Sequence, residues 1–157
     1  MIFEFGYHKI DVDVEKTRAF YEQAELLTEG CECLNCKKYE KAVDFADVEV
    51  KEIFAAFGAD MKKAAEVWGY FVKEKGKMEY HGFYHLCGRL LEGGFLYQRV
   101  ADKQYMMMDD CMHVVNENFQ IGFAEEIQLL EEGFPEPVVQ LEFSITLPWV
   151  LEEDYIE

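Results

Sequence analysis

Three cysteines within six residues carry the clearest chemical signal of the sequence. Cys31, Cys33 and Cys36 form a Cys-x-Cys-x-x-Cys segment. Thiolates bind Zn²⁺ in tetrahedral sites, and a Cys-x-x-Cys pair folds readily around one ion. Lys37 and Lys38 follow directly, and nearby cations lower the pKa of a thiol. The segment predicts a thiolate metal site. The alternatives are a redox-active dithiol and reduced thiols that only pack a turn.

A fourth zinc ligand must come from a distant part of the chain. His85 and Cys87 lie two residues apart on a predicted strand, so about 6.6 Å separates their Cα atoms. Cys111 and His113 repeat this spacing on another predicted strand. Burial in the sheet with ordinary partners is the alternative for all four residues. The candidate metal ligands that we select are Cys31, Cys33, Cys36, His85 and Cys87.

Several other reactive residue types have a structural explanation as well. Asp11 and Asp13 resemble a metal-binding Asp-x-Asp pair, but Asp13 is also well placed to cap a helix that starts at Val14. The methionines of 105–108 could bind Cu(I), although a strand buried on both faces accounts for them. Ser144 is the only serine, and no sharp turn surrounds it that would expose a nucleophile.

Net charge limits the classes of partner. The 157 residues include 15 Lys and Arg against 32 Asp and Glu, a formal charge of −17. No Lys or Arg follows Lys103. Nucleic-acid binding depends on cationic side chains, so this class is excluded. An anionic field of this size repels anions and attracts cations, which predicts a basic protein or a cationic ligand as partner.

The sequence shows no pattern typical of a targeting signal or a membrane segment. The first residues lack a basic stretch followed by an apolar run, as a signal peptide requires. No stretch approaches the roughly 18 apolar residues that a membrane span needs. The cysteines number five, and an odd number of thiols without an export signal is typical of a reducing compartment. We therefore expect a cytoplasmic protein.

Hydrophobic periodicity changes near the middle of the chain. Residues 13–72 read mainly as helix and residues 77–150 alternate with a period of two, as strands do. Helices followed by strands predict an α+β fold, with N-terminal helices packed on one face of a mostly antiparallel C-terminal sheet. We expect one domain over 1–157, because a half of this length rarely builds a large core alone. Two small domains are the alternative.

The expected elements are as follows. A first strand covers 1–12, a helix starts at Val14 and ends by Gly30, and a further helix ends at Gly58. Asp60 is expected to cap another helix that includes Trp68. Expected strands cover 80–90, 95–100, 104–108, 111–123 and 138–147, while 124–132 is ambiguous and is compatible with a short helix.

Three segments carry a resemblance to known proteins. They are the Cys31–Cys36 loop running into Lys37-Lys38-Tyr39, the late Gln140-Leu141-Glu142-Phe143, and the Leu147-Pro148-Trp149-Val150-Leu151-Glu152-Glu153 end. Over most of its length the chain resembles a group of small bacterial cytosolic proteins that have no established activity. The resemblance implies a bacterial cytosolic setting and assigns no functional residues.

These observations favour a binding module for a cationic partner or ligand. The alternative is a zinc-binding thiolate protein centred on Cys31, Cys33 and Cys36. A small enzyme that uses the aromatic and carboxylate residues of the strands is the third hypothesis.

Overall fold

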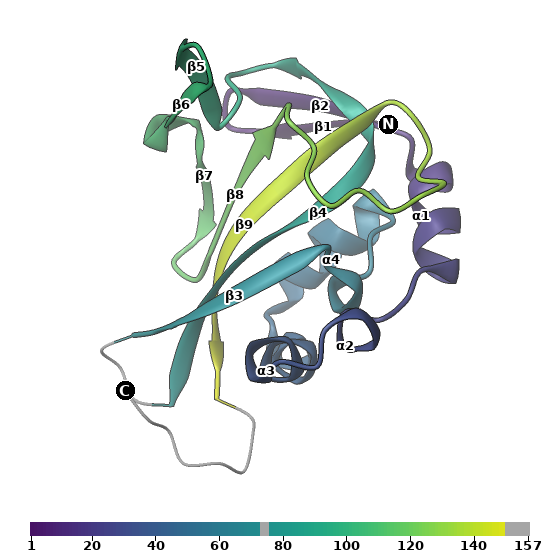
Figure 1. Cartoon of the computed structure of the whole chain (residues 1–157), viewed down its shortest axis with the longest axis vertical. Coiled ribbons are helices and arrows are strands. Elements are labelled where there is room, and N and C mark those ends of the chain that lie inside the picture. The colour runs from purple at the N-terminus through teal and green to yellow at the C-terminus, as the bar shows by residue number, and fades with distance from the viewer. Residues whose placement is uncertain (73–75, 150–157) are drawn as a thin grey trace.

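The structure is a computed structural model that describes residues 1–72 and 76–149 (Figure 1). It is an α+β protein with a mostly antiparallel sheet, as predicted. The helices are α1 Val14–Gln23, α2 Leu27–Gly30, α3 Leu34–Ala42 and α4 Val48–Phe57, with 3₁₀ turns at Val43–Phe45, Met61–Lys63 and Asp109–Cys111.

Seven strands form the main sheet, in the order β1-β2-β4-β9-β8-β7, with β3 pairing to β4 beside this path. Strands β5 and β6 form a separate hairpin. All neighbouring strands are antiparallel. The strands are β1 Ile2–Phe5, β2 His8–Val12, β3 Glu66–Phe71, β4 Lys77–Glu92, β5 Tyr97–Ala101, β6 Gln104–Met107, β7 His113–Asn116, β8 Phe119–Ala124 and β9 Val138–Pro148.

Strand β4 has 16 residues and organises the sheet. Along one edge it pairs first with β3 and then with β2, while β9 follows its other edge. Two glycines let the neighbouring backbones approach. A Cβ on Gly82 would lie 2.2 Å from the Glu66 carbonyl oxygen, and one on Gly88 would lie 2.2 Å from that of Asp11. Any side chain at either position would displace the adjacent backbone.

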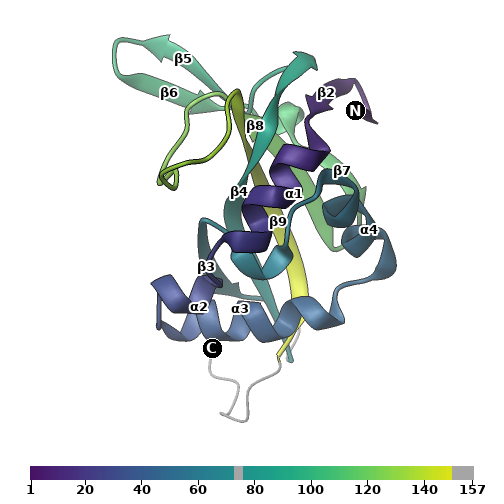
Figure 2. The ribbon, with the colours of Figure 1, turned by 90° about the vertical axis from the view of Figure 1, so that its right-hand side faces the viewer.

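Aromatic side chains from the helices contact one face of the sheet. The ring of Tyr39 in α3 lies 5.3 Å from that of Tyr80, and the ring of Phe54 in α4 lies 4.8 Å from that of Tyr84. Tyr84 donates a hydrogen bond of 2.6 Å to the Met61 carbonyl and is itself hydrogen-bonded to the Tyr39 hydroxyl. Figures 1 and 2 show α1 to α4 on the same side of β4 and β9.

The first half of the chain differs from the prediction in three places. The helix expected from Val14 to Gly30 is interrupted, because α1 ends at Gln23 and α2 covers only Leu27–Gly30. Residues 1–12 form two strands instead of one, because Gly6 adopts a φ of +61° and turns the chain back on itself. These strands join the sheet, so it is not wholly C-terminal. Asp60 caps only one 3₁₀ turn, and Trp68 lies in strand β3. The alternating aromatic residues of this segment pair with β4, which overrides the predicted helix.

The second half differs in fewer places. The segment 111–123 contains the hairpin β7–β8 instead of one strand, and 124–132 contains no helix. The last strand is confirmed as β9.

Candidate thiolate site

The short connection between α2 and α3 brings the three cysteine sulfurs together. Cys31 is the C-cap of α2, Cys33 is the N-cap of α3, and Cys36 lies in the first turn of α3. All three Sγ atoms lie within 4.8 Å of one another, and those of Cys31 and Cys33 are 3.2 Å apart. The structure thus places the whole Cys-x-Cys-x-x-Cys segment in one cluster, as its spacing predicts.

The cluster contains thiols of very different acidity. Burial raises the pKa of Cys36 well above that of an ordinary thiol, and its hydrogen bonds to the other two thiols act in the same direction. Cys33 is exposed. Its small burial opposes ionisation, but the backbone N–H of Cys36 and the thiols of Cys31 and Cys36 outweigh this effect and lower the pKa of Cys33. Cys33 therefore ionises before Cys36.

The sulfur positions are close to those of a metal site. Zn–S bonds of about 2.3 Å in a tetrahedral site place sulfurs about 3.8 Å apart. The Cys31–Cys33 separation of 3.2 Å is shorter than this value and the other two separations do not exceed 4.8 Å, so binding of one ion by all three thiolates requires only side-chain rotations. In the part of the chain that the structure describes, no further His, Cys, Asp or Glu joins the cluster. A bound metal would keep one open position.

The structure does not bring the other two selected ligands to the cluster. His85 is 4% exposed, and its Nε2 lies 3.1 Å from the Gln140 side-chain oxygen. The buried Sγ of Cys87 lies 3.6 Å from the Glu136 carbonyl oxygen. Burial lowers the pKa of His85 and raises that of Cys87. Both side chains therefore have ordinary buried partners, the alternative considered for them.

Cys111 and His113 do not face His85 and Cys87 either, since β8 and β9 separate β7 from β4. The ring of His113 lies 5.9 Å from that of Phe5. Burial lowers the pKa of His113, and the proximity of His8 adds to the effect. These two predicted strand positions therefore form no joint site.

His8 is a buried imidazole that the sequence analysis missed. It is 1% exposed, and its Nε2 lies 3.1 Å from the Gly94 carbonyl oxygen. Its Nδ1 has no hydrogen-bond partner among the described residues. The alternation of β2 places it on the same face as Ile10 and Val12, a signal that the sequence contained.

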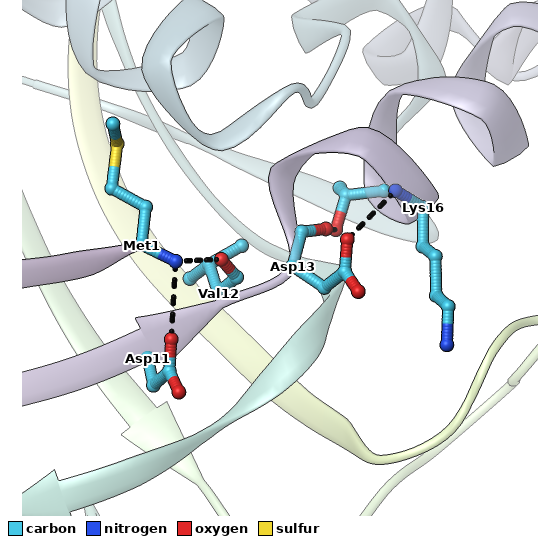
Figure 3. A network of polar contacts seen from close by, with 6 residues as sticks. Met1, Asp11, Val12, Asp13 and Lys16 are labelled. Atoms are coloured by element: carbon cyan, nitrogen blue, oxygen red, sulfur yellow. Dashed lines mark hydrogen bonds and ion pairs between the residues drawn. The ribbon is translucent and has the colours of Figure 1, made fainter.

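The two carboxylates of the Asp-x-Asp pair make structural contacts (Figure 3). Asp13 accepts a hydrogen bond of 3.1 Å from the Lys16 backbone N–H and so caps α1, as predicted. Asp11 lies 3.1 Å from the amino group of Met1, which also donates to the Val12 carbonyl. The two carboxylates have separate partners.

Glu142 is a second buried polar residue that the sequence analysis missed. It is 9% exposed on the face of β9 that points away from the helices. Tyr97 donates a hydrogen bond of 2.8 Å to its carboxylate, and the Gln140 amide donates another of 3.2 Å. Burial raises the pKa of Glu142, and these hydrogen bonds oppose the rise. Neighbouring Ser144 lies in the same regular strand, without a nucleophile turn.

Ion pairs leave most of the acidic charge uncompensated. With 15 Lys and Arg for 32 Asp and Glu, complete pairing would still leave 17 carboxylates without a cation. Ion pairs such as Arg99–Asp102 at 2.7 Å join exposed side chains, where such pairs contribute little to stability. The anionic field predicted from composition therefore persists in the folded chain.

Comparisons with protein-family models, with curated proteins and with solved structures found no match for the chain. Among the described residues, no helix has the length and apolar character needed to cross a membrane.

Proposed function

We propose that the chain binds a thiophilic metal ion, Zn²⁺ in the first place, through Cys31, Cys33 and Cys36. The observation that carries this proposal is the position of the three Sγ atoms within 4.8 Å of one another. Soft thiolate ligands select Zn²⁺ or Cu(I) over hard cations. Three protein ligands and an open fourth position are typical of sites where zinc meets a substrate or exchanges with another protein.

The unequal thiols suggest an order of binding. Cys33 ionises more readily than Cys36 and offers its thiolate before Cys36 does. Cys36 holds its proton and loses it when the metal arrives, because a coordinating thiol is deprotonated. Binding therefore releases protons, and the apparent affinity rises with pH.

Zinc titration of the reduced protein tests the proposal. We expect one equivalent of zinc to bind in competition with a chromophoric chelator. Cys33→Ser and Cys36→Ser should each weaken zinc binding at least tenfold, because the loss of a metal ligand costs more affinity than the roughly tenfold effect of disturbing a residue that supports a ligand. Cys111→Ser removes a buried thiol outside the cluster and should bind as the parent does.

Two results contradict the metal site. One is zinc binding that survives both cluster substitutions. The other is the absence of zinc binding in protein whose Cys33 and Cys36 readily form a disulfide with oxidised glutathione. The second result would assign the cluster to thiol–disulfide chemistry, for which an exposed acidic thiol beside a buried one is also suited.

We also propose that the chain binds a cationic partner or ligand. The excess of 17 carboxylates supports this second function, since opposite charge accelerates encounter and favours complementary surfaces. Capture of a lysine-rich peptide at low salt, lost at about 0.5 M NaCl through screening, tests it. No binding of this peptide at low salt would contradict it.

A further inference from the structure

A cavity of about 300 Å³ lies beside the thiolate site. It is lined by α1, α2, the start of β3 and the segment between β8 and β9. Its volume is at the lower end of the range for small-molecule sites. Its apolar lining includes Phe20, Tyr21, Ala24, Leu27, Ala64 and Phe134.

The aromatic part of the wall is well packed. The rings of Phe20 and Phe134 lie 4.5 Å apart, and the ring of His85 lies 5.9 Å from that of Phe134. All three side chains are more than nine-tenths buried. This wall is held in place before any ligand arrives, which reduces the entropy lost on binding.

The charged groups of the lining are mainly acidic. Of the described residues, Glu25, Glu66 and Glu131 line the cavity with Lys63 as the one ammonium group, a net charge of −2. Lys63 already donates a hydrogen bond of 2.5 Å to the Tyr21 carbonyl. The three carboxylates have no ion-pair partner among the described residues. The cavity thus combines an apolar wall, of which the packed rings leave only a small part accessible, with uncompensated negative charge.

We infer that this cavity binds a small organic cation with an apolar body, of the arylalkylammonium class. The apolar body would fill the space beside Phe20 and Phe134, and the ammonium group would meet the carboxylates. The inference rests on the proposed affinity for cations and adds a site and a ligand class to it. Cys31 also lines the cavity, so the ligand would lie next to the thiolate cluster.

Binding of 2-phenylethylammonium, followed by amide chemical shifts in NMR spectra, tests the inference. We expect the largest shifts at residues that line the cavity. The uncharged isostere 2-phenylethanol should bind about tenfold more weakly. Glu66→Gln should weaken binding of the cation about twofold to fivefold, the range for a partly exposed charge pair. Glu126→Gln, a change outside this cavity, should have no effect.

The position of Gly30 accepts a larger side chain without a clash. It lines the cavity at the end of α2, and a Cβ there would meet nothing within 4 Å. Gly30→Leu should abolish binding of the cation with an unchanged melting temperature. Gly30→Ala, which adds a single methyl group, should retain it.

The outcomes separate the inference from the function on which it rests. Equal binding of 2-phenylethylammonium by Gly30→Leu and the parent, equal affinity for the alcohol, or no binding of the cation would each overturn the cavity site. If the lysine-rich peptide is still captured in those cases, cation binding stands and only its location is wrong. If neither the peptide nor the small cation binds, both proposals fail.

Discussion

At single residues, burial and hydrogen bonding compete to set acidity. Cys33 and Cys36 belong to one turn of chain, yet the pKa of Cys33 is lowered and that of Cys36 is raised. The spacing of the cysteines was sufficient to predict that their sulfurs meet. It could not show which sulfur faces water, because burial depends on how α2 and α3 pack.

The same limit applies to the remaining site residues. His85 and Cys87 were selected as metal ligands for their spacing. Their partners, Gln140 and Glu136, lie 55 and 49 residues further along the chain. A local pattern does not contain that information. Glu142 was overlooked because the sequence does not distinguish it from the other acidic residues, 32 in all. Its hydrogen bond from the Tyr97 hydroxyl is evident only in the folded chain.

Glu142 should make stability depend on pH in a defined direction. Its pKa in the folded chain is raised above about 4.3, the ordinary value for Glu. At pH values between about 4.3 and the raised pKa of the folded chain, Glu142 keeps a proton in the folded state that it has lost in the unfolded state. The free energy of unfolding therefore falls as pH rises through this range. The contribution is complete below about pH 4.3 and lost above the folded pKa.

Glu142→Gln removes this titration. Urea unfolding between pH 4 and pH 7 should show the variant gaining stability relative to the parent as pH rises, while Glu126→Gln, at an exposed position, stays parallel to the parent. A difference between parent and Glu142→Gln that is independent of pH would contradict the assignment.

At the scale of elements, the prediction succeeded where local signals are strong. Asp13 caps α1, Gly58 ends α4 with a φ of +84°, and β9 alternates as its sequence indicates. The predictions failed in segments whose local structure is determined by pairing with another strand. Trp68 follows the preceding apolar residues at helical spacing, but the backbone of its segment pairs with strand β4. The hairpin at 1–12 depends on a single glycine turn.

Capping should contribute measurably to the stability of α1. Asp13→Ala removes the acceptor for the Lys16 backbone N–H and should cost about 1 kcal/mol, a fall of roughly 2–4 °C in melting temperature for a chain of this size. Asp13→Asn keeps a side-chain acceptor and should lose far less. Equal losses in the two variants by thermal unfolding would show that the cap is not the cause.

For the whole molecule, self-repulsion is the dominant electrostatic effect. A charge of −17 disfavours the compact state, because folding brings the carboxylates closer together. Salt shortens the range of this repulsion, from about 30 Å at 0.01 M to about 8 Å at 0.15 M.

The melting temperature should therefore rise with NaCl over this concentration range, by a few degrees if the repulsion opposes folding by about 1 kcal/mol. Differential scanning calorimetry at constant pH is the measurement. A melting temperature that falls with added NaCl would mean that attractive ion pairs outweigh repulsion, contrary to the composition.

The position of β4 has a consequence for how the chain reaches this structure. Val12 pairs with Gly88, and Leu86 pairs with Val139, so partners for the central strand come from both ends of the sequence. Each pairing closes a large loop, whose entropy must be lost before its contacts are gained. Topologies dominated by such distant pairings fold slowly. The hairpins β3–β4 and β7–β8 can form early, but the sheet is complete only after β2 and β9 arrive. Until then the unpaired backbone edges of β4 are open to other chains.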